Sequence, residues 1–370
     1  MRARMWWFPT ASTHRAVADP PATLPSVADT DPSPAASPIE HDVPGALLDA
    51  SAQLFDADAA HGVSLSLVVQ HRGHVIHERY GHQPDTIFGP GGPVDADTTL
   101  ISWSMAKSIT HALLGIVVAD GLLDVDGPAP VPEWAGTEKE TIQLLDLLEM
   151  RPGLAFVEDY VDDQTSNCLE MLYGEGKDDM AAYAASLPLI HRPGTVWNYS
   201  SGTTNIICRI IGRAIAPTAT GEEARAATEE FIHERLFHPL GMTSAIASFD
   251  PAGTFIGSSY VYATARDFAR FGELYLRDGV APDGTRILPP GWVDHARTYV
   301  ASDDDGFDYG RHWWLWPDLG AFGAHGYEGQ YTIVVPDREL VVVHLGKSPI
   351  ERRVPLTDRL RTIIRAFDPT

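Results

Sequence analysis

Apolar, β-branched runs stand near both ends of this 370-residue chain, and they constrain its fold more than any other feature. Residues 63–70 (VSLSLVVQ) and 74–80 are separated by a short turn that contains glycine, which is typical of a β-hairpin. Residues 331–335 and 340–345 form a second pair, joined by the four-residue turn PDRE. We therefore predict an antiparallel sheet assembled from both chain ends, with the chain between them inserted as helices.

The domain organisation follows from how composition changes along the chain. Residues 1–40 are rich in Pro, Ala, Ser, Thr and Asp without an apolar period, which predicts a flexible N-terminal arm. Residues 41–128 and 241–370 are predicted to form an α/β (α+β) sheet domain, and residues 129–240 a mostly helical domain. A first helix is predicted to begin near Ala46. Further helices are predicted at 108–123, 142–150, 180–187, 203–214, 222–236, 265–276 and 355–367, with Thr264 as the N-cap of the helix at 265–276.

Charge excludes several classes of partner. The chain has 50 acidic and 27 basic residues, a formal net charge of −23, so it should repel nucleic acid and anionic membrane surfaces. The two cysteines, Cys168 and Cys208, indicate free thiols in a reducing compartment, with a single disulfide as the alternative. The N-terminal apolar run is too short for a secretory signal, so we expect a cytoplasmic protein; an atypical signal within the arm is the alternative.

Ser104 and Lys107 form an S-x-x-K motif at the start of a strongly apolar stretch. On a helix, residues three apart share a face, so a hydroxyl and an amine can meet there. Serine is a weak nucleophile at neutral pH, and a lysine can serve as its base when its surroundings disfavour the ammonium form. The chain has four lysines, so about 0.2 such motifs are expected by chance. The alternative is a surface serine beside a lysine that reaches solvent.

Two further motifs follow along the chain. Tyr199 and Ser201 lie in PGTVWNYSSG (193–202), directly before an apolar helical pattern, and FGAHGYEGQYTIVVP (322–336) precedes the last predicted strand. Together the three motifs resemble those of the serine β-lactamase and penicillin-binding-protein superfamily. Within it they are most similar to the branch of class C β-lactamases, family VIII-type carboxylesterases and 6-aminohexanoate-dimer hydrolases. The resemblance covers roughly residues 45–367 and implies a β-lactamase/transpeptidase-like fold with the active site between the two domains.

The resemblance also implies a role for each motif residue. Ser104 would be the acylated nucleophile and Lys107 its base partner. Tyr199 would be a second acid/base, which protonates the leaving group and later activates water, while Ser201 would orient the substrate and Lys107. The backbone N–H groups of Ser104 and Tyr327 would form an oxyanion hole, whose donors contribute several kcal/mol in such enzymes.

The third motif departs from the β-lactamase pattern. Where those enzymes carry Lys-Thr-Gly, this chain has Ala324, His325 and Gly326. The family lysine holds the carboxylate of a β-lactam, which Ala324 cannot do, so the departure favours the dimer-hydrolase branch and an ester or linear amide substrate. Gly326 and His325 would line the substrate site. His325 either acts there as a cation or is a structural histidine, and we favour the structural role.

The acidic segment 157–163 resembles the E-D-Y loop of the dimer hydrolases. The resemblance implies that Tyr160 closes on the substrate and donates a hydrogen bond to the scissile amide nitrogen. An acidic lid would suit an amine-bearing substrate, and a solvated acidic loop is the equal alternative. Five tryptophans are candidates for an apolar pocket, although core packing is favoured for the last three: Trp103, Trp197, Trp313, Trp314 and Trp316.

No cofactor is expected. His233 and His238 are five positions apart, not four as in a metalloprotease helix, and neither a P-loop nor a G-x-G-x-x-G is present. The predicted partner is a small-molecule ester or amide, without nucleic acid or membrane, and a homodimer is left open. The function favoured by the motifs is a serine hydrolase with an acyl-enzyme intermediate. The alternatives are a β-lactamase or D-Ala-D-Ala carboxypeptidase, and a catalytically silent binding member of the fold.

Overall fold

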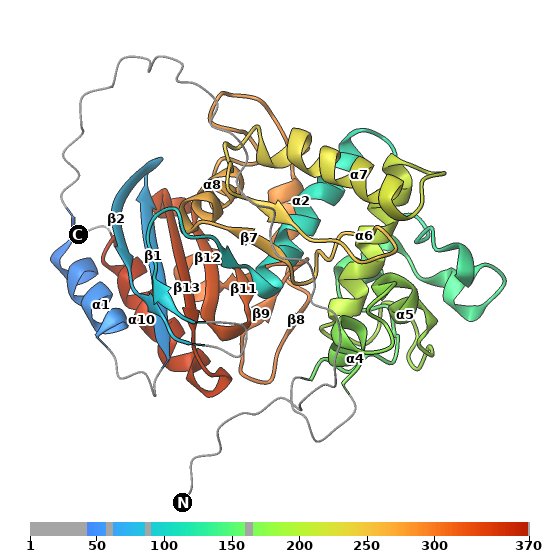
Figure 1. The fold of residues 1–370 in the computed structure, drawn as a ribbon, viewed down its shortest axis with the longest axis horizontal. Helices are drawn as coiled ribbons and strands as arrows, with labels where there is room; N and C mark the ends of the chain where they lie inside the picture. The colour runs from blue at the N-terminus through green and yellow to red at the C-terminus, as the bar shows by residue number, and fades with distance from the viewer. Residues whose placement is uncertain (1–42, 57–61, 86–89, 160–165, 369–370) are drawn as a thin grey trace, which may run out of the picture.

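The computed structural model describes residues 43–56, 62–85, 90–159 and 166–368. Its centre is an eight-stranded antiparallel sheet in the order β2-β1-β13-β12-β11-β10-β9-β8 (Figure 1). β1 (Val63–His71) pairs with β2 (His74–Tyr80) on one side and with β13 (Leu340–Lys347) on the other. The predicted sheet built from both chain ends and both predicted hairpins are therefore confirmed.

The other strands complete this sheet and two small ones. In the main sheet they are β12 (Gln330–Val335), β11 (Ala321–Gly326), β10 (Trp314–Trp316), β9 (Asp308–Tyr309) and β8 (Ala301–Ser302). A three-stranded sheet contains β5 (Leu100–Ile101), β7 (Val261–Ala263) and β6 (Ile246–Ala247), and β3 (His82–Gln83) pairs with β4 (Gly92–Pro93). The three-stranded sheet matters for the site, because β5 leads directly into the segment that carries Ser104.

Helices cover both faces of the main sheet and continue beyond one side of it. They are α1 (Gly45–Phe55), α2 (Ala106–Ala119), α3 (Leu144–Leu148), α4 (Asn167–Tyr173), α5 (Met180–Ser186), α6 (Ser201–Ile215), α7 (Gly221–Ile232), α8 (Ala265–Leu276), α9 (Trp292–Ala296) and α10 (Arg353–Arg365). α1 and α10 pack together on one face, and α8 packs against β1, β12 and β13 on the other. α4 to α7 lie to the right of the sheet in Figure 1, with α2 between them and the strands. The predicted domain limits at residues 128 and 240 stay a prediction.

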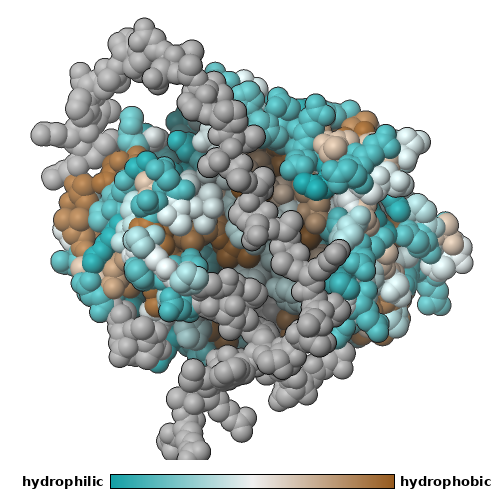
Figure 2. All heavy atoms as spheres, viewed as in Figure 1, coloured by the Kyte–Doolittle hydropathy of each residue, from teal (hydrophilic) through white to brown (hydrophobic). Residues whose placement is uncertain are grey.

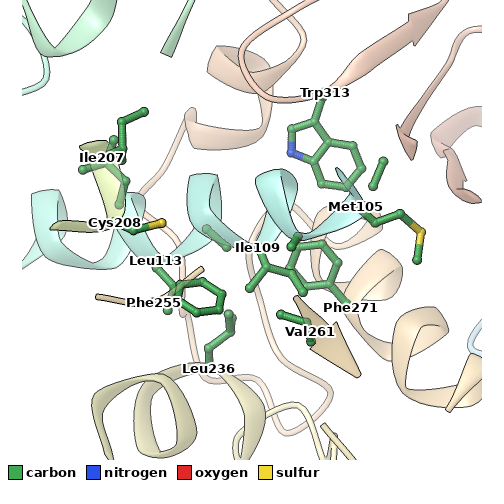
Figure 3. Packing of buried hydrophobic residues seen from close by; sticks show 14 of the residues in the cluster. Met105, Ile109, Leu113, Ile207, Cys208, Leu236, Phe255, Val261, Phe271 and Trp313 are labelled. Carbon is green, nitrogen blue, oxygen red and sulfur yellow. The ribbon is translucent and has the colours of Figure 1, made fainter. Parts of the chain in front are cut away.

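α2 is the central element of the larger apolar core. Met105, Ile109 and Leu113 follow one another at helical spacing and are almost fully buried. Figure 3 shows these side chains surrounded by residues from several distant segments, among them Ile207 of α6 and Phe271 of α8. Because α2 is covered on all sides for most of its length, a polar side chain in its first turn is also removed from water.

Several element limits differ from the sequence predictions. The helix predicted at 108–123 begins at Ala106, after a 3₁₀ turn, and ends at Ala119 because Gly121 adopts a left-handed φ of 73°. α4 and α9 were not predicted, since seven and five residues carry too little periodicity to stand out. Thr264 caps α8 as predicted, with its side chain accepting a hydrogen bond from the Asp267 amide.

Figure 2 shows hydrophilic residues over most of the described part of this face, in keeping with the excess of acidic residues. Cys168 and Cys208 are buried free thiols, as predicted. Within the described ranges, no helix has both the length and the apolar character needed to cross a membrane. The predicted N-terminal arm and Tyr160 lie outside the described residues.

Candidate active site

Ser104 lies in a 3₁₀ turn (Trp103–Met105) that connects β5 to α2. Ser102 anchors this turn to β7, because its amide donates to the Val261 carbonyl at 2.8 Å and its Oγ accepts from the Val261 amide at 3.1 Å. Trp103, directly before the serine, has a φ of 43°, in the left-handed region that bulky residues rarely adopt. Such a conformation costs about 1–3 kcal/mol and persists only where the surrounding structure holds it.

Lys107 lies one turn further along, with only 2% of its surface exposed. Its Nζ lies 2.9 Å from Ser104 Oγ, 3.0 Å from Ser201 Oγ and 3.0 Å from the Ser258 carbonyl oxygen. The structure therefore brings the S-x-x-K pair together with Ser201, 94 positions further along the chain. Ser258 was missed from sequence, because it contributes a backbone carbonyl and no motif marks it.

Tyr199 and Ser201 are positioned by the start of α6. Ser200 is the N-cap of this helix, and its Oγ accepts a hydrogen bond from the Thr203 amide at 3.0 Å. The cap places Ser201 in the first turn beside Lys107. The Tyr199 ring lies over the lysine, with its centroid 4.8 Å from Nζ. Among the described residues the Tyr199 hydroxyl has no hydrogen-bond partner, and Tyr199 lines the cleft.

Glu158 joins this cluster from the acidic loop. The Ser201 amide donates to its Oε2 at 2.7 Å, and the Ser201 hydroxyl donates to its Oε1 at 2.6 Å. In the sequence Glu158 is one of four acidic residues within positions 158–163, and nothing local distinguishes it from the other three. The Cys168 thiol is close by, and burial together with the Glu158 carboxylate raises its pKa well above the ordinary value.

The third motif ends β11 directly against the nucleophile turn. A side chain on Gly326 would place its Cβ 2.3 Å from the Ser102 carbonyl oxygen, which is closer than atoms can approach. Glycine therefore lets the end of β11 reach the turn that carries Ser104. Tyr327 follows, with 38% of its surface exposed and its ring edge-on to Trp103 at 6.0 Å.

His325 is held as a structural group. Its Nε2 accepts a hydrogen bond from the Trp316 indole N–H at 2.8 Å, and its ring stacks on Trp314 at 5.3 Å. Burial, followed by the nearby charges of Arg353 and Arg361, lowers its pKa well below the ordinary value. These contacts describe a neutral imidazole and favour the structural role over the cationic one.

A second buried histidine supports the cluster from behind. His312 Nδ1 donates to the Leu148 carbonyl oxygen at 3.0 Å, and its Nε2 accepts from Thr204 at 3.1 Å. Its own carbonyl oxygen accepts from Ser108 at 2.7 Å. Burial lowers its pKa to about 3, so this link between α2, α3 and α6 uses the neutral ring.

These elements border a cleft of about 680 Å³. Ser104, Tyr199, His325, Gly326 and Tyr327 all line it, as do Trp197 and Trp314, whereas Trp313 and Trp316 are buried in the core. Its described lining holds the carboxylates of Glu158, Asp303, Asp304 and Glu328 and the guanidinium of Arg353. Within the described ranges, no group of three His, Cys, Asp or Glu side chains is arranged to hold a metal ion.

The architecture is that of a serine hydrolase with a β-lactamase-like fold. The chain matches the Beta-lactamase family over residues 51–363 and belongs to that family. These findings confirm the predicted fold and enzyme class. The site roles assigned by resemblance stay predictions.

Two curated proteins with different names are similar to this chain in sequence. The 6-aminohexanoate-dimer hydrolase of Paenarthrobacter ureafaciens is 28% identical over 268 residues, which cover 66% of this chain and 65% of that protein. The chain thus spans slightly less than two thirds of that relative. Penicillin-binding protein 4 of Amycolatopsis lactamdurans is 27% identical, with 88% of this chain and 86% of that protein covered.

A solved structure agrees with the assignment of the fold. The crystal structure of a family VIII carboxylesterase matches with a TM-score of 0.67 over 88% of this chain and 99% of that chain. Its sequence identity is 17%, so this likeness shows the fold alone.

Proposed function

We propose that the protein hydrolyses esters or linear amides through an acyl-enzyme on Ser104. The observation that carries this proposal is the contact of a buried lysine with the serine: Lys107 Nζ lies 2.9 Å from Ser104 Oγ. A lysine held in this way can accept the serine proton when it is in its neutral form. A catalytically silent member of the fold would have no need to bury an amine against a hydroxyl at the edge of a cleft.

The reaction follows from this contact. Ser104 Oγ attacks the substrate carbonyl carbon while its proton passes to Lys107 Nζ. The negative charge that develops on the carbonyl oxygen is stabilised by the backbone N–H groups of Ser104 and Tyr327. Tyr199 gives a proton to the leaving alkoxide or amine and regains one from Lys107. In the second half, water attacks the acyl-enzyme and gives a proton to Tyr199, which passes its own proton to the neutral Lys107. Lys107 then returns that proton to Ser104 Oγ as the acyl group leaves.

The cleft supports a neutral or amine-bearing substrate. Among the described residues, four carboxylates and one guanidinium line it. Two of these carboxylates are paired, Asp303 with Arg353 and Glu328 with Lys347, each at 2.7 Å. Ala324, at the position of the β-lactamase lysine, is buried in the core and offers no charge to a substrate carboxylate. The similarity to a 6-aminohexanoate-dimer hydrolase supports a linear amide with a terminal amine as one substrate of this class.

A fluorophosphonate probe and a panel of chromogenic short-chain esters test the acyl-enzyme. We expect one covalent adduct, located on Ser104 by mass spectrometry, and ester turnover that Ser104→Ala removes. Turnover that persists in Ser104→Ala, or an active protein without an adduct, would contradict the proposal. A parallel panel of 6-aminohexanoate oligomers and simple alkyl amides then separates amide from ester preference.

The second candidate is a β-lactamase or D-Ala-D-Ala carboxypeptidase, favoured by the similarity to a penicillin-binding protein over most of both chains. Nitrocefin and a D-Ala-D-Ala peptide measure it directly. Because a carboxylate substrate meets no lysine at Ala324, we expect kcat/KM for either to be at least about 100-fold below that for the best ester. An equal or higher value would favour this second candidate.

A further inference from the structure

The hydrogen bonds around Ser201 have a fixed direction. The Ser201 hydroxyl has one hydrogen, and it donates this hydrogen to Glu158 Oε1 at 2.6 Å. A carboxylate only accepts, so this bond cannot reverse. Toward Lys107, 3.0 Å away, Ser201 Oγ is therefore left as an acceptor. The Ser258 carbonyl oxygen, also 3.0 Å from Nζ, is likewise only an acceptor.

This direction decides where the lone pair of a neutral lysine points. A neutral amine has two hydrogens and one lone pair. Since Ser201 and Ser258 each require a hydrogen from Nζ, the remaining position, 2.9 Å from Ser104 Oγ, holds the lone pair. That orientation lets Lys107 accept the serine proton without rearrangement, which a general base requires.

We propose that Glu158 is a positioning residue that holds the neutral Lys107 amine with its lone pair facing Ser104. The inference rests on the proposed acyl-enzyme mechanism and extends it to the loop that precedes Tyr160. A second bond secures the carboxylate, because its Oε2 accepts from the Ser201 amide at 2.7 Å. This amide belongs to the first turn of α6, where the helix dipole also favours a negative charge.

Burial keeps four described titratable groups around this network neutral at neutral pH. They are Cys208 of α6, Cys168 of α4, His312 before β10 and Tyr309 of β9. Burial raises the pKa of Cys208 to about 12 and lowers that of His312 to about 3. Burial also raises the pKa of Cys168 and Tyr309 well above their ordinary values. The carboxylate of Glu158 is thus the negative charge that the network places beside the lysine.

Glu158→Gln tests the proposal in the full-length enzyme, with a p-nitrophenyl ester as substrate. The amide oxygen of glutamine can accept from the Ser201 amide while its nitrogen donates to Ser201 Oγ. Ser201 can then donate its hydrogen to the lone pair of Lys107. That lone pair is no longer available to accept the proton of Ser104. We expect kcat/KM to fall about 10–100-fold. Because a negative charge beside the ammonium is lost, the acid limb of the pH profile should move to lower pH by about half a unit to one unit.

Glu230→Gln is the matched control, since Glu230 is an exposed carboxylate of α7 that neither lines the cleft nor bonds to this network. It should keep the acid limb in place and change kcat/KM by less than about threefold. Glu158→Asp retains the charge but shortens the side chain, so kcat/KM should fall while the acid limb stays. In a Ser201→Ala background, Glu158→Gln should have little further effect on the plateau value of kcat/KM, because the bond it reverses is gone, while the acid limb should still move because the charge is lost.

The possible results separate the inference from the proposed function. Wild-type kcat/KM in Glu158→Gln overturns the inference, and so does a loss of activity without movement of the acid limb, which is what purely structural damage would produce. If Glu158→Gln does not fold, a displaced acid limb in Glu158→Asp overturns it instead. A wild-type enzyme without Ser104-dependent turnover would overturn the proposed function itself.

Discussion

The two sides of the cleft are built from different kinds of contact. On the side that we call the helical wall (Ser104, Lys107, Tyr199, Ser201 and Glu158), hydrogen bonds and one ring converge on the lysine Nζ. On the sheet wall (Trp314, His325, Tyr331 and Arg353), ring stacking dominates, and the one cation is neutralised by Asp303. The helical wall therefore offers proton transfer, whereas the sheet wall offers shape and apolar surface. The following predictions test this division.

Ser104→Ala should have the largest effect. It removes the nucleophile of the helical wall while adding no volume, so ester kcat/KM should fall by at least about 1,000-fold. The thermal midpoint should stay within a few degrees of the wild type, because the side chain is small and partly exposed. Steady-state kinetics and thermal unfolding check both parts. Loss of folding instead of activity would show that Ser104 is structural.

Gly326→Ala should have the next largest effect, since it disturbs the junction of the two walls. The added Cβ would meet the Ser102 carbonyl oxygen at 2.3 Å, so the end of β11 must move away from the nucleophile turn. We expect kcat to fall about 10–100-fold and the free energy of unfolding to drop by about 1–3 kcal/mol. Gly45→Ala is the control, because no atom lies within 4 Å of its added Cβ. Equal kinetics for the two variants would contradict the close contact.

Arg353→Gln should affect substrate binding more than chemistry. Its guanidinium pairs with Asp303 at 2.7 Å and lies 4.9 Å from the Trp314 ring centroid, so its loss alters the sheet wall without touching Lys107. We expect KM for the best ester to rise about 3–10-fold with kcat within about twofold. Arg72→Gln, at an exposed ion pair with Glu339, should leave both constants unchanged. A fall in kcat larger than the rise in KM would remove the distinction between the walls.

Mild acidification from neutral pH should have the smallest effect of these changes, and it should act on folding stability. Burial lowers the pKa of His312, behind the helical wall, to about 3 and that of His344, within β13, to about 4, from 6.5 when exposed. The unfolded chain therefore binds more protons below pH 6.5, and folding stability falls as the pH drops from there toward 4. Each histidine should contribute about 1.4 kcal/mol per pH unit in this window. Denaturant unfolding at several pH values measures the slope, and constant stability across the window would contradict the buried neutral rings.

Part of this architecture was accessible from local patterns. The β1–β2 and β12–β13 hairpins have alternating or β-branched residues and short turns, so the sequence predicted each of them to within one or two residues. The S-x-x-K pair needed only helical spacing, and Ser104 and Lys107 meet at 2.9 Å as that spacing implies. Short elements such as α9 lacked a pattern, because five residues complete barely more than one helical turn.

The sequence by itself determined the class of this protein: a sheet from both chain ends, a serine and a lysine on one helical turn, and a third motif without its lysine. Only the tertiary structure decided which distant groups complete the site. Ser258 contributes a backbone carbonyl that has no side-chain signature. Glu158 is one of four acidic residues within positions 158–163, and only its hydrogen bonds from Ser201 distinguish it. The third motif singled out Gly326, but only the structure shows that the Ser102 carbonyl oxygen lies against it and leaves no room for a side chain. Such contacts join segments far apart in the chain, and local propensity carries no information about them.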